Sequence, residues 1–235
     1  MKPLHKHHSP NELFIKVWDD VEHFVPQEAF MRLVTETAME MDEVLGRYDS
    51  WAYGWSGGKD SLALQFMIDT VYGETPPKAM QGQMRDSSLD FVWEFTEVQQ
   101  YNDQYRPDYC EVVYEEFTVD WLAKHEKHLF PTGSGDGYFW TQRGTRNPQH
   151  TYRNKHNIGL MIYGRTRKDG NFCPKNVQGV QETNDHIQYS PLRNWPIEAI
   201  LAAMYYGGWD LPPVYKWEGG WKHGTGPWAG RHYET

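Results

Sequence analysis

The sequence predicts an α/β fold in which a mostly parallel sheet is sandwiched between layers of helices. An aromatic strand at 51–55 leads directly into a glycine-rich loop, and an amphipathic helix follows that loop. Strand and helix patterns then alternate along the chain, which is typical of parallel sheets covered on both faces. The length of 235 residues suits one substantial domain rather than two.

The remaining elements follow from hydrophobic spacing and from helix-ending residues. About 25 residues at the start lack periodicity and are interpreted as an arm. The next helix has Pro26 in its first turn and ends near Gly46, and its apolar residues share one 3.6-residue stripe. The later expected elements are a weak strand at 79–84, a helix through 91–98, a strand at 110–114, a short helix around 119–122, a loop at about 131–157, a clear strand at 158–163 and a final helix at 196–206.

These elements predict a single domain with three parts. Residues 1–46 hold the arm and the first helix, and residues 47–215 hold the α/β unit with its glycine-rich loop. Residues 216–235 form a tail rich in Gly and Trp. We interpret that tail as coil that packs its aromatic rings across the body or across a partner subunit. A homo-oligomer is therefore one of the two possibilities.

Composition excludes several classes of protein. No apolar run approaches the about 18 residues that span a bilayer, so we expect no membrane partner. The first eight residues lack the apolar stretch of a secretory signal, which predicts a cytoplasmic location. Cys110 and Cys173 are too few for a disulfide framework or a four-cysteine metal site. A net charge of −9 makes non-specific nucleic-acid binding less expected.

The loop at 56–61 has the composition of an anion site. Glycines allow the backbone N–H groups to approach an anion closely, and the following helix directs its positive end to the same point. A lysine adds a full charge, hydroxyls add donors, and the aspartate suits a helix cap or a magnesium ligand. The candidate nucleotide-binding residues of this loop are Ser56, Gly57, Gly58, Lys59, Asp60 and Ser61.

The loop differs from the Walker A loop of nucleoside triphosphatases. A Walker A loop has four residues between its first glycine and Gly-Lys, and Ser or Thr follows the lysine. Here Gly54 and Gly58 enclose three residues, and Asp60 follows Lys59. Machinery that cleaves the γ-phosphate is therefore not expected.

Ser-Gly-Gly-Lys-Asp-Ser resembles the signature loop of the PP-loop ATP pyrophosphatases, which include the sulfonucleotide (PAPS) reductases. Three further segments are similar to reductase motifs and occur in the same order. They are Asp86-Ser87-Ser88, Gly164-Arg165-Thr166-Arg167, and Ser190-Pro191-Leu192-Arg193-Asn194-Trp195 with Leu211-Pro212-Pro213-Val214-Tyr215. The resemblance covers roughly residues 48–216 and implies an adenine nucleotide alpha hydrolase-like, Rossmann-like fold.

One part of the reductase pattern is missing. The reductases carry a nucleophilic cysteine near the C-terminus, whereas no cysteine follows Cys173 in this chain. Without a thiolate there, attack on a sulfate sulfur has no candidate group. We therefore do not expect sulfonucleotide reduction.

The resemblance implies an enzyme that uses ATP and Mg²⁺ and cleaves ATP to AMP and pyrophosphate. It would adenylate an acceptor substrate of unknown identity, which a second nucleophile then attacks. The implied catalytic residues are Lys59, Arg165 and Arg167, whose positive charges would meet the phosphates, together with Asp60. Asp86, Gly164 and Arg165 join the loop in binding the nucleotide, and Asp60 and Asp86 are the implied magnesium ligands. No residue stands out as a general base, and Asp60 and Asp86 are the best carboxylate candidates.

Two alternatives remain open from the sequence. A non-catalytic nucleotide-binding subunit or regulator would keep the scaffold and explain the missing cysteine. An enzyme that modifies a nucleic-acid base would grip its substrate with the central loop. The cations available there are Arg143, Arg146, Arg153 and Lys155.

Overall fold

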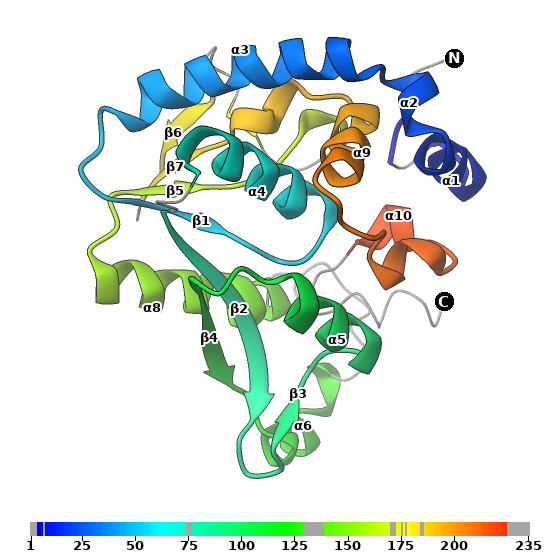
Figure 1. The fold of residues 1–235 in the computed structure, drawn as a ribbon. Helices are drawn as coiled ribbons and strands as arrows, with labels where there is room; N and C mark the ends of the chain where they lie inside the picture. The colour runs from blue at the N-terminus through cyan, green and yellow to red at the C-terminus, as the bar shows by residue number, and fades with distance from the viewer. Residues whose placement is uncertain are drawn as a thin grey trace.

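The computed structural model describes residues 4–6, 8–73, 77–128, 139–169, 173–174, 176, 178–183 and 186–224. Within these residues, one mixed sheet is flanked by helices on both faces (Figure 1). The predicted α/β class is therefore confirmed.

The sheet is mostly parallel, as predicted. The strands pair in the order β3-β2-β1-β5-β7-β6, and β4 also pairs with β2. Along β2, β1 pairs with residues 78–80, β3 pairs with residues 85–86, and β4 pairs with residues 79–85. β3 and β6 are antiparallel to their neighbours, and the other pairs are parallel. The strands are β1 Trp51–Gly54, β2 Lys78–Asp86, β3 Phe91–Val92, β4 Cys110–Glu116, β5 Leu160–Ile162, β6 Val180–Glu182 and β7 Ile187–Tyr189.

Nine α-helices and several single turns surround the sheet in the described part of the chain. The helices are α1 Asn11–Asp19, α2 Val21–Phe24, α3 Gln27–Leu45, α4 Lys59–Tyr72, α5 Thr96–Tyr105, α6 Val119–Lys124, α8 Asn147–His156, α9 Ile197–Tyr206 and α10 Gly220–His223. The turns are Glu126–His128, Gln142–Arg146, Arg167–Asp169, Pro191–Asn194 and Pro213–Lys216.

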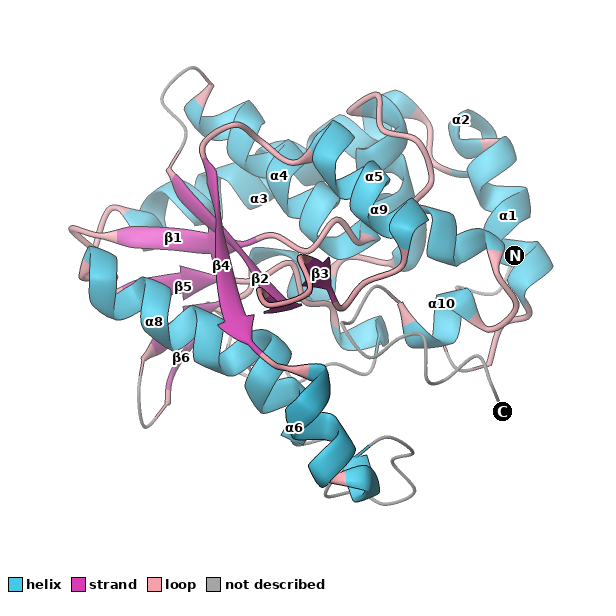
Figure 2. Ribbon diagram, turned by 90° about the horizontal axis from the view of Figure 1, so that it is seen from below, coloured by secondary structure: helices cyan, strands magenta, loops and turns pink. Residues whose placement is uncertain are grey.

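Each face of the sheet contributes to a separate core. Side chains alternate along a strand, so Tyr53 of β1 enters the larger core while its neighbour Ala52 enters a smaller one. The larger core contains the apolar faces of α3, α4 and α9, and α4 packs directly on α9. The smaller core lies under α8, which crosses β2 and β4 (Figure 2). Both faces are therefore buried, as a parallel sheet requires.

The first residues form helices where the sequence predicts an arm. α1 and α2 occupy 11–24, and both pack against α9. Phe14 and Val17 are buried, and the Phe14 ring stacks on Trp221 of α10 with centroids 4.5 Å apart. These helices are too short for a sustained apolar stripe, so contacts distant in sequence stabilise them.

The expected loop at 131–157 is largely helical where the structure describes it. The turn Gln142–Arg146 leads into α8, which has Pro148 in its first turn, where a proline fits without loss of a hydrogen bond. α8 buries Tyr152 and Arg153 against the sheet. Its sequence is polar almost throughout, and this is why hydrophobic spacing did not predict it. Residues 129–138 of the expected loop lie outside the described residues.

The predicted tail is described only as far as 224. It contains the short helix α10, which packs on α1 and on the turn Pro213–Lys216 that precedes it. No helix in the described ranges is long and apolar enough to cross a membrane.

Candidate functional site

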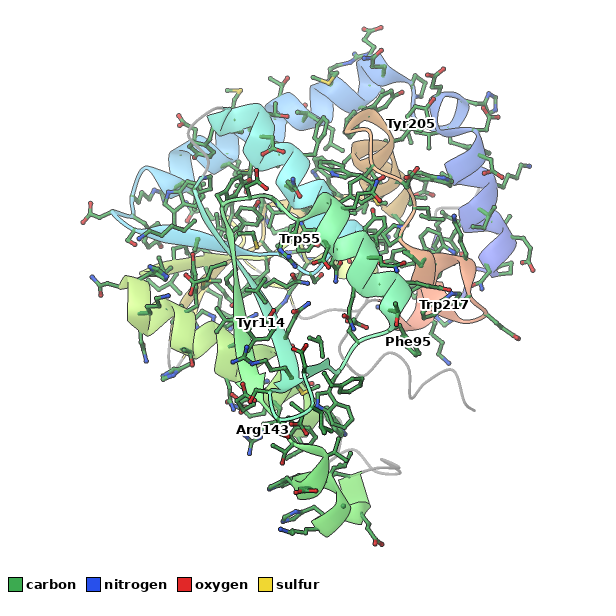
Figure 3. The ribbon with its side chains drawn as sticks, turned by 60° about the horizontal axis from the view of Figure 1, so that its bottom comes forward. Trp55, Phe95, Tyr114, Arg143, Tyr205 and Trp217 are labelled. Atoms are coloured by element: carbon green, nitrogen blue, oxygen red, sulfur yellow. The ribbon has the colours of Figure 1, made fainter. Side chains whose placement is uncertain are left out.

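The glycine-rich loop lies at the carboxyl end of the central strand. β1 is flanked by β2 and β5, with Tyr53 opposite Ala79 on one side and Ile162 on the other. Trp55, which is labelled in Figure 3, continues the pairing because its N–H donates to the Met80 carbonyl at 2.8 Å. α4 then begins at Lys59 and runs for 14 residues, so its positive end faces the loop.

Two glycines are required by close approach of neighbouring groups. Gly57 has a φ of +68°, and a Cβ there would overlap the side-chain oxygen of Asn102. That oxygen is buried and has no hydrogen-bond partner among the described residues. A Cβ at Gly164 would overlap the backbone carbonyl of Asp60. The Gly-x-Arg segment therefore packs against the first turn of α4.

The loop is held in shape by hydrogen bonds within the loop and by one to the Tyr215 side chain. The Ser61 hydroxyl accepts from the Ser56 N–H at 3.1 Å and donates to the Gly58 carbonyl at 2.9 Å. The Lys59 N–H donates to the Tyr215 hydroxyl at 3.2 Å. The segment 211–215, which the sequence singles out, thus holds the start of α4 in place.

Lys59 and Asp60 form an ion pair at the helix start. The Lys59 ammonium lies 2.9 Å from both carboxylate oxygens of Asp60. The Lys59 side chain is 3% exposed and that of Asp60 is 23% exposed, so Asp60 is the partner that reaches the surface of the site.

A cavity of about 260 Å³ opens beside the loop. It lies at the carboxyl ends of β1, β2 and β5, where ligands bind in open α/β sheets. Five predicted site residues line it: Ser56, Asp60, Ser61, Gly164 and Arg165. The other predicted site residues Gly57, Gly58, Lys59, Asp86 and Arg167 do not line it.

The two predicted arginines have different surroundings. Arg165 lines the cavity, where its guanidinium lies 4.4 Å from the Tyr163 ring centroid and donates to the Gln188 side chain at 3.2 Å. Arg167 donates instead to the Asn194 side chain at 2.6 Å and to the Pro174 carbonyl at 2.8 Å. Arg165 is therefore the arginine that the fold directs to the cavity.

Asp86 has its carboxylate engaged at the end of β2. It accepts from the Ser88 hydroxyl at 2.5 Å, from the Ser88 N–H at 3.1 Å and from the Val119 N–H at 2.7 Å. These hydrogen bonds, led by that of the Ser88 hydroxyl, lower the pKa of Asp86. Here the carboxylate joins the β2–β3 turn to the start of α6.

The donor set for magnesium is sparse. The described residues contain no group of three His, Cys, Asp or Glu side chains placed to hold a metal. Of the two predicted ligands, Asp60 reaches the cavity and Asp86 does not. Since Mg²⁺ is commonly bound by one or two carboxylates together with substrate phosphates, Asp60 fits a site that a bound nucleotide would complete.

Several cavity residues were not predicted from the sequence. Glu94 follows β3 and lines the cavity, and burial there raises its pKa to about 7. Gln149 of α8 accepts a hydrogen bond from the Tyr163 hydroxyl at 3.0 Å. An acidic residue inside the aromatic run 91–95 is the one sequence signal that could have indicated Glu94. The other unpredicted polar lining residues are Gln81, Gln83 and Thr145.

Both cysteines are buried, in agreement with an inert role. Burial raises the pKa of the Cys110 thiol to about 12. Burial also raises the pKa of Cys173, although Arg165 and Arg167 act in the opposite direction. Neither thiol lines the cavity.

The cations of the expected central loop do not form one exposed basic surface. Arg143 pairs with Glu115 at 2.5 Å, and Lys155 pairs with Glu111 at 2.7 Å. Arg153 is buried against the sheet. Carboxylates of β4 therefore neutralise two of the cations that the nucleic-acid alternative requires.

Solved structures of two enzymes are similar to this chain. The phosphoadenylyl-sulfate (PAPS) reductase from Candida auris, a phosphate complex, has a TM-score of 0.54 and 14% identity, covering 82% of this chain and 92% of the reductase. The FMN adenylyltransferase from Candida glabrata, in complex with FAD and inorganic pyrophosphate, has a TM-score of 0.51 and 12% identity. The match covers 87% of this chain and 67% of the adenylyltransferase. No protein-family model and no curated protein sequence matches the chain.

These likenesses establish the fold of the chain. This chain shares the α/β fold of both enzymes, a mostly parallel sheet flanked by helices. The resemblance based on the loop and the three later segments is therefore confirmed at the level of the fold.

Proposed function

We propose that this protein binds ATP at the loop and cavity and cleaves it between the α- and β-phosphates. Pyrophosphate would leave, and the adenylyl group would pass to an acceptor that a second nucleophile then attacks with loss of AMP. The observation that carries the proposal is the meeting of Ser56, Asp60, Ser61 and Arg165 in one cavity at the amino end of α4.

The positions of these groups suit a phosphate chain. Backbone N–H groups at the start of α4 and the hydroxyls of Ser56 and Ser61 would bind the departing pyrophosphate. Support comes from the similar adenylyltransferase structure, which holds FAD and inorganic pyrophosphate, and from the similar reductase structure, which holds phosphate.

Catalysis would rest on positioning and on electrostatic stabilisation, as phosphoryl transfer generally allows. Arg165 would stabilise charge that develops on the α-phosphate, because it lines the same cavity as the loop residues Ser56 and Ser61. Lys59 supplies the full positive charge of the loop. Asp60 would hold Mg²⁺, which supplies charge neutralisation for the triphosphate when bound.

The test uses the purified protein with Mg²⁺ and ATP labelled separately at the α- and γ-positions, with and without cell extract. Labelled AMP and pyrophosphate are the expected products. Their increase on addition of extract would show that the extract contains the acceptor. Formation of ADP and phosphate would contradict the proposed bond cleavage.

Lys59→Ala is the matched variant for this test. We expect it to remain folded and to lose most of its affinity for ATP, because the loop then lacks its full charge. Unchanged ATP affinity in a folded Lys59→Ala protein would remove Lys59 from the site. If the wild-type protein binds ATP tightly without turnover, the non-catalytic alternative replaces the enzymatic one.

A further inference from the structure

We propose that Glu94 is the general base of this site and that the group attacking the α-phosphorus is a neutral hydroxyl, of the acceptor or of water. The proposal rests on the proposed function and adds the proton acceptor and the chemical class of the nucleophile. It follows from where Glu94 lies, how its backbone is held and which charges surround it.

Glu94 lines the same cavity as Asp60 and Arg165. It follows β3, whereas Asp60 belongs to α4 and Arg165 follows β5. A nucleotide bound along the loop would therefore share this cavity with both Glu94 and Arg165.

The backbone around Glu94 is anchored on both sides. The Trp93 indole N–H donates to the Phe117 carbonyl at 2.7 Å, and the Gln99 side chain donates to the Glu94 carbonyl at 2.8 Å. The ring of Phe95 contacts that of Trp217 edge to face, with centroids 4.9 Å apart, and Figure 3 shows the two side by side. A catalytic group has to be held in this way to act on a positioned substrate.

Few hydrogen bonds or positive charges stabilise the ionised carboxylate of Glu94. The Phe95 N–H, at 3.2 Å, is its one hydrogen-bond donor among the described residues, and no ion pair joins it to a cation there. The titratable or charged groups that share the cavity wall are Asp60 of α4, and Tyr163 and Arg165 after β5. Burial with so little compensation raises the pKa of Glu94 to about 7, which suits a base that works near neutral pH.

The same carboxylate restricts the nucleophile. An anionic acceptor group would meet both the triphosphate and Glu94, so it would enter against two like charges. A neutral hydroxyl meets a hydrogen-bond acceptor instead. In the step, the hydroxyl oxygen bonds to the α-phosphorus, and the bond from that phosphorus to the bridging oxygen breaks. Pyrophosphate leaves with the electron pair, and the proton passes to Glu94 and then to solvent.

The test measures AMP formation from Mg²⁺-ATP in ¹⁸O-labelled water, with methanol added as a second hydroxyl probe, from pH 5 to 9. In the wild-type protein we expect ¹⁸O in the AMP phosphate, and adenosine 5′-methyl phosphate when methanol is present. The rate should fall about tenfold for each pH unit below about 7, as for a single essential base.

Glu94→Gln should lower kcat by a factor of about 100 or more and lose this acidic limb, while the Kd for ATP stays the same. Glu97→Gln is the matched control, because Glu97 lies exposed in the first turn of α5. It should keep the wild-type profile. Glu94→Asp provides a second variant that keeps the carboxylate, and it should retain the acidic limb at a reduced rate.

The outcomes separate the two proposals. A wild-type rate and pH profile in Glu94→Gln would overturn the role of Glu94 and leave α–β cleavage intact. If the adenylyl group passes to neither water nor methanol, and AMP forms only when the extract supplies an anionic acceptor, the hydroxyl nucleophile would be overturned. Absence of AMP from wild-type protein at every pH, both with and without cell extract, would overturn the proposed function, and the base role with it.

Discussion

Gly57 shows how one residue sets the shape of the phosphate loop. Its left-handed backbone and the nearby side-chain oxygen of Asn102 both exclude a Cβ. Gly57→Ala should therefore combine backbone strain of about 1–2 kcal/mol with displacement of the loop. We expect the free energy of unfolding to fall and the affinity for ATP to fall more than tenfold, as measured by chemical denaturation and by calorimetric titration.

Gly208→Ala is a control that separates backbone strain from displacement of the loop. Gly208 has a φ of +78°, and a Cβ there meets no atom within 4 Å. This control should show similar strain without loss of ATP affinity. Equal ATP affinities in Gly57→Ala and Gly208→Ala would mean that the loop conformation does not depend on the absence of a Cβ at 57.

The raised pKa of Glu94 leads to a prediction about the free energy of unfolding, which can be tested without enzymatic turnover. Burial raises its pKa from 4.5 to about 7, so the folded protein binds more protons than the unfolded chain between these values. The contribution of Glu94 to the free energy of unfolding should therefore fall as pH rises through this window, by about 3 kcal/mol, and level off above it. Glu94→Gln should lack this loss.

Urea denaturation at pH 5 and pH 8 measures the effect. Relative to wild type, Glu94→Gln should be more stable at pH 8 than at pH 5, whereas Glu97→Gln should show no pH-dependent difference. Parallel pH dependence in Glu94→Gln and wild type would show that the carboxyl group of Glu94 titrates normally in the folded protein.

At the scale of elements, a charged clamp joins α3 to the Pro191–Asn194 turn. The Arg193 guanidinium donates to both carboxylate oxygens of Glu40 at 2.7 Å, and the Tyr189 hydroxyl donates to one of them at 2.8 Å. The side chain of Arg193 is 3% exposed and that of Glu40 is 33% exposed. The segment 190–195, which resembles a reductase motif, thus has a structural role in this chain.

Glu40→Gln should destabilise the protein by about 2–4 kcal/mol, because it leaves a buried guanidinium with much less compensation. The lower part of this range applies since a third of Glu40 reaches water. Glu43→Gln on the same helix breaks an exposed pair with Arg47 and should cost less than about 1 kcal/mol. Equal unfolding free energies for the two variants, by urea denaturation, would contradict the clamp.

The elements also show what the sequence could predict. β1, the loop and α4 are encoded locally, by an aromatic run, two glycines and an amphipathic stripe, and all three were predicted. β6 and β7 have three residues each, too few for a clear alternating pattern. β6 pairs with the neighbouring β7, and β7 joins the sheet only by pairing with β5, which is distant in sequence. α8 was missed because its buried residues, Tyr152 and Arg153, are few in a polar sequence.

The residues of the candidate site also divide into those that the sequence could predict and those that it could not. The loop and Arg165 could be predicted because each lies in a contiguous motif. Glu94 and Gln149 reach the cavity only because β3 turns back on β2 and α8 crosses the sheet. Such residues are brought together by tertiary structure, which spacing along the sequence does not encode.

For the whole molecule, the cavity joins segments from β1, β2, β5, α4 and the π-helical turn before α8, so a ligand bound there should stabilise the entire fold. ATP with Mg²⁺ at about 100 times its Kd should raise the free energy of unfolding by about 2.7 kcal/mol. In a chain of this size, that corresponds to an increase in Tm of about 5–10 °C, measurable by calorimetry.

Magnesium and the loop charge can be separated in the same experiment. Asp60 alone among the predicted ligands reaches the cavity, so the metal would depend on the nucleotide and the nucleotide on the metal. EDTA should therefore remove most of the shift that ATP causes, and Mg²⁺ alone should cause none. Lys59→Ala should show no shift under any of these conditions. A full shift with ATP and EDTA would mean that the site binds the nucleotide without a metal, and no shift in wild type would contradict nucleotide binding itself.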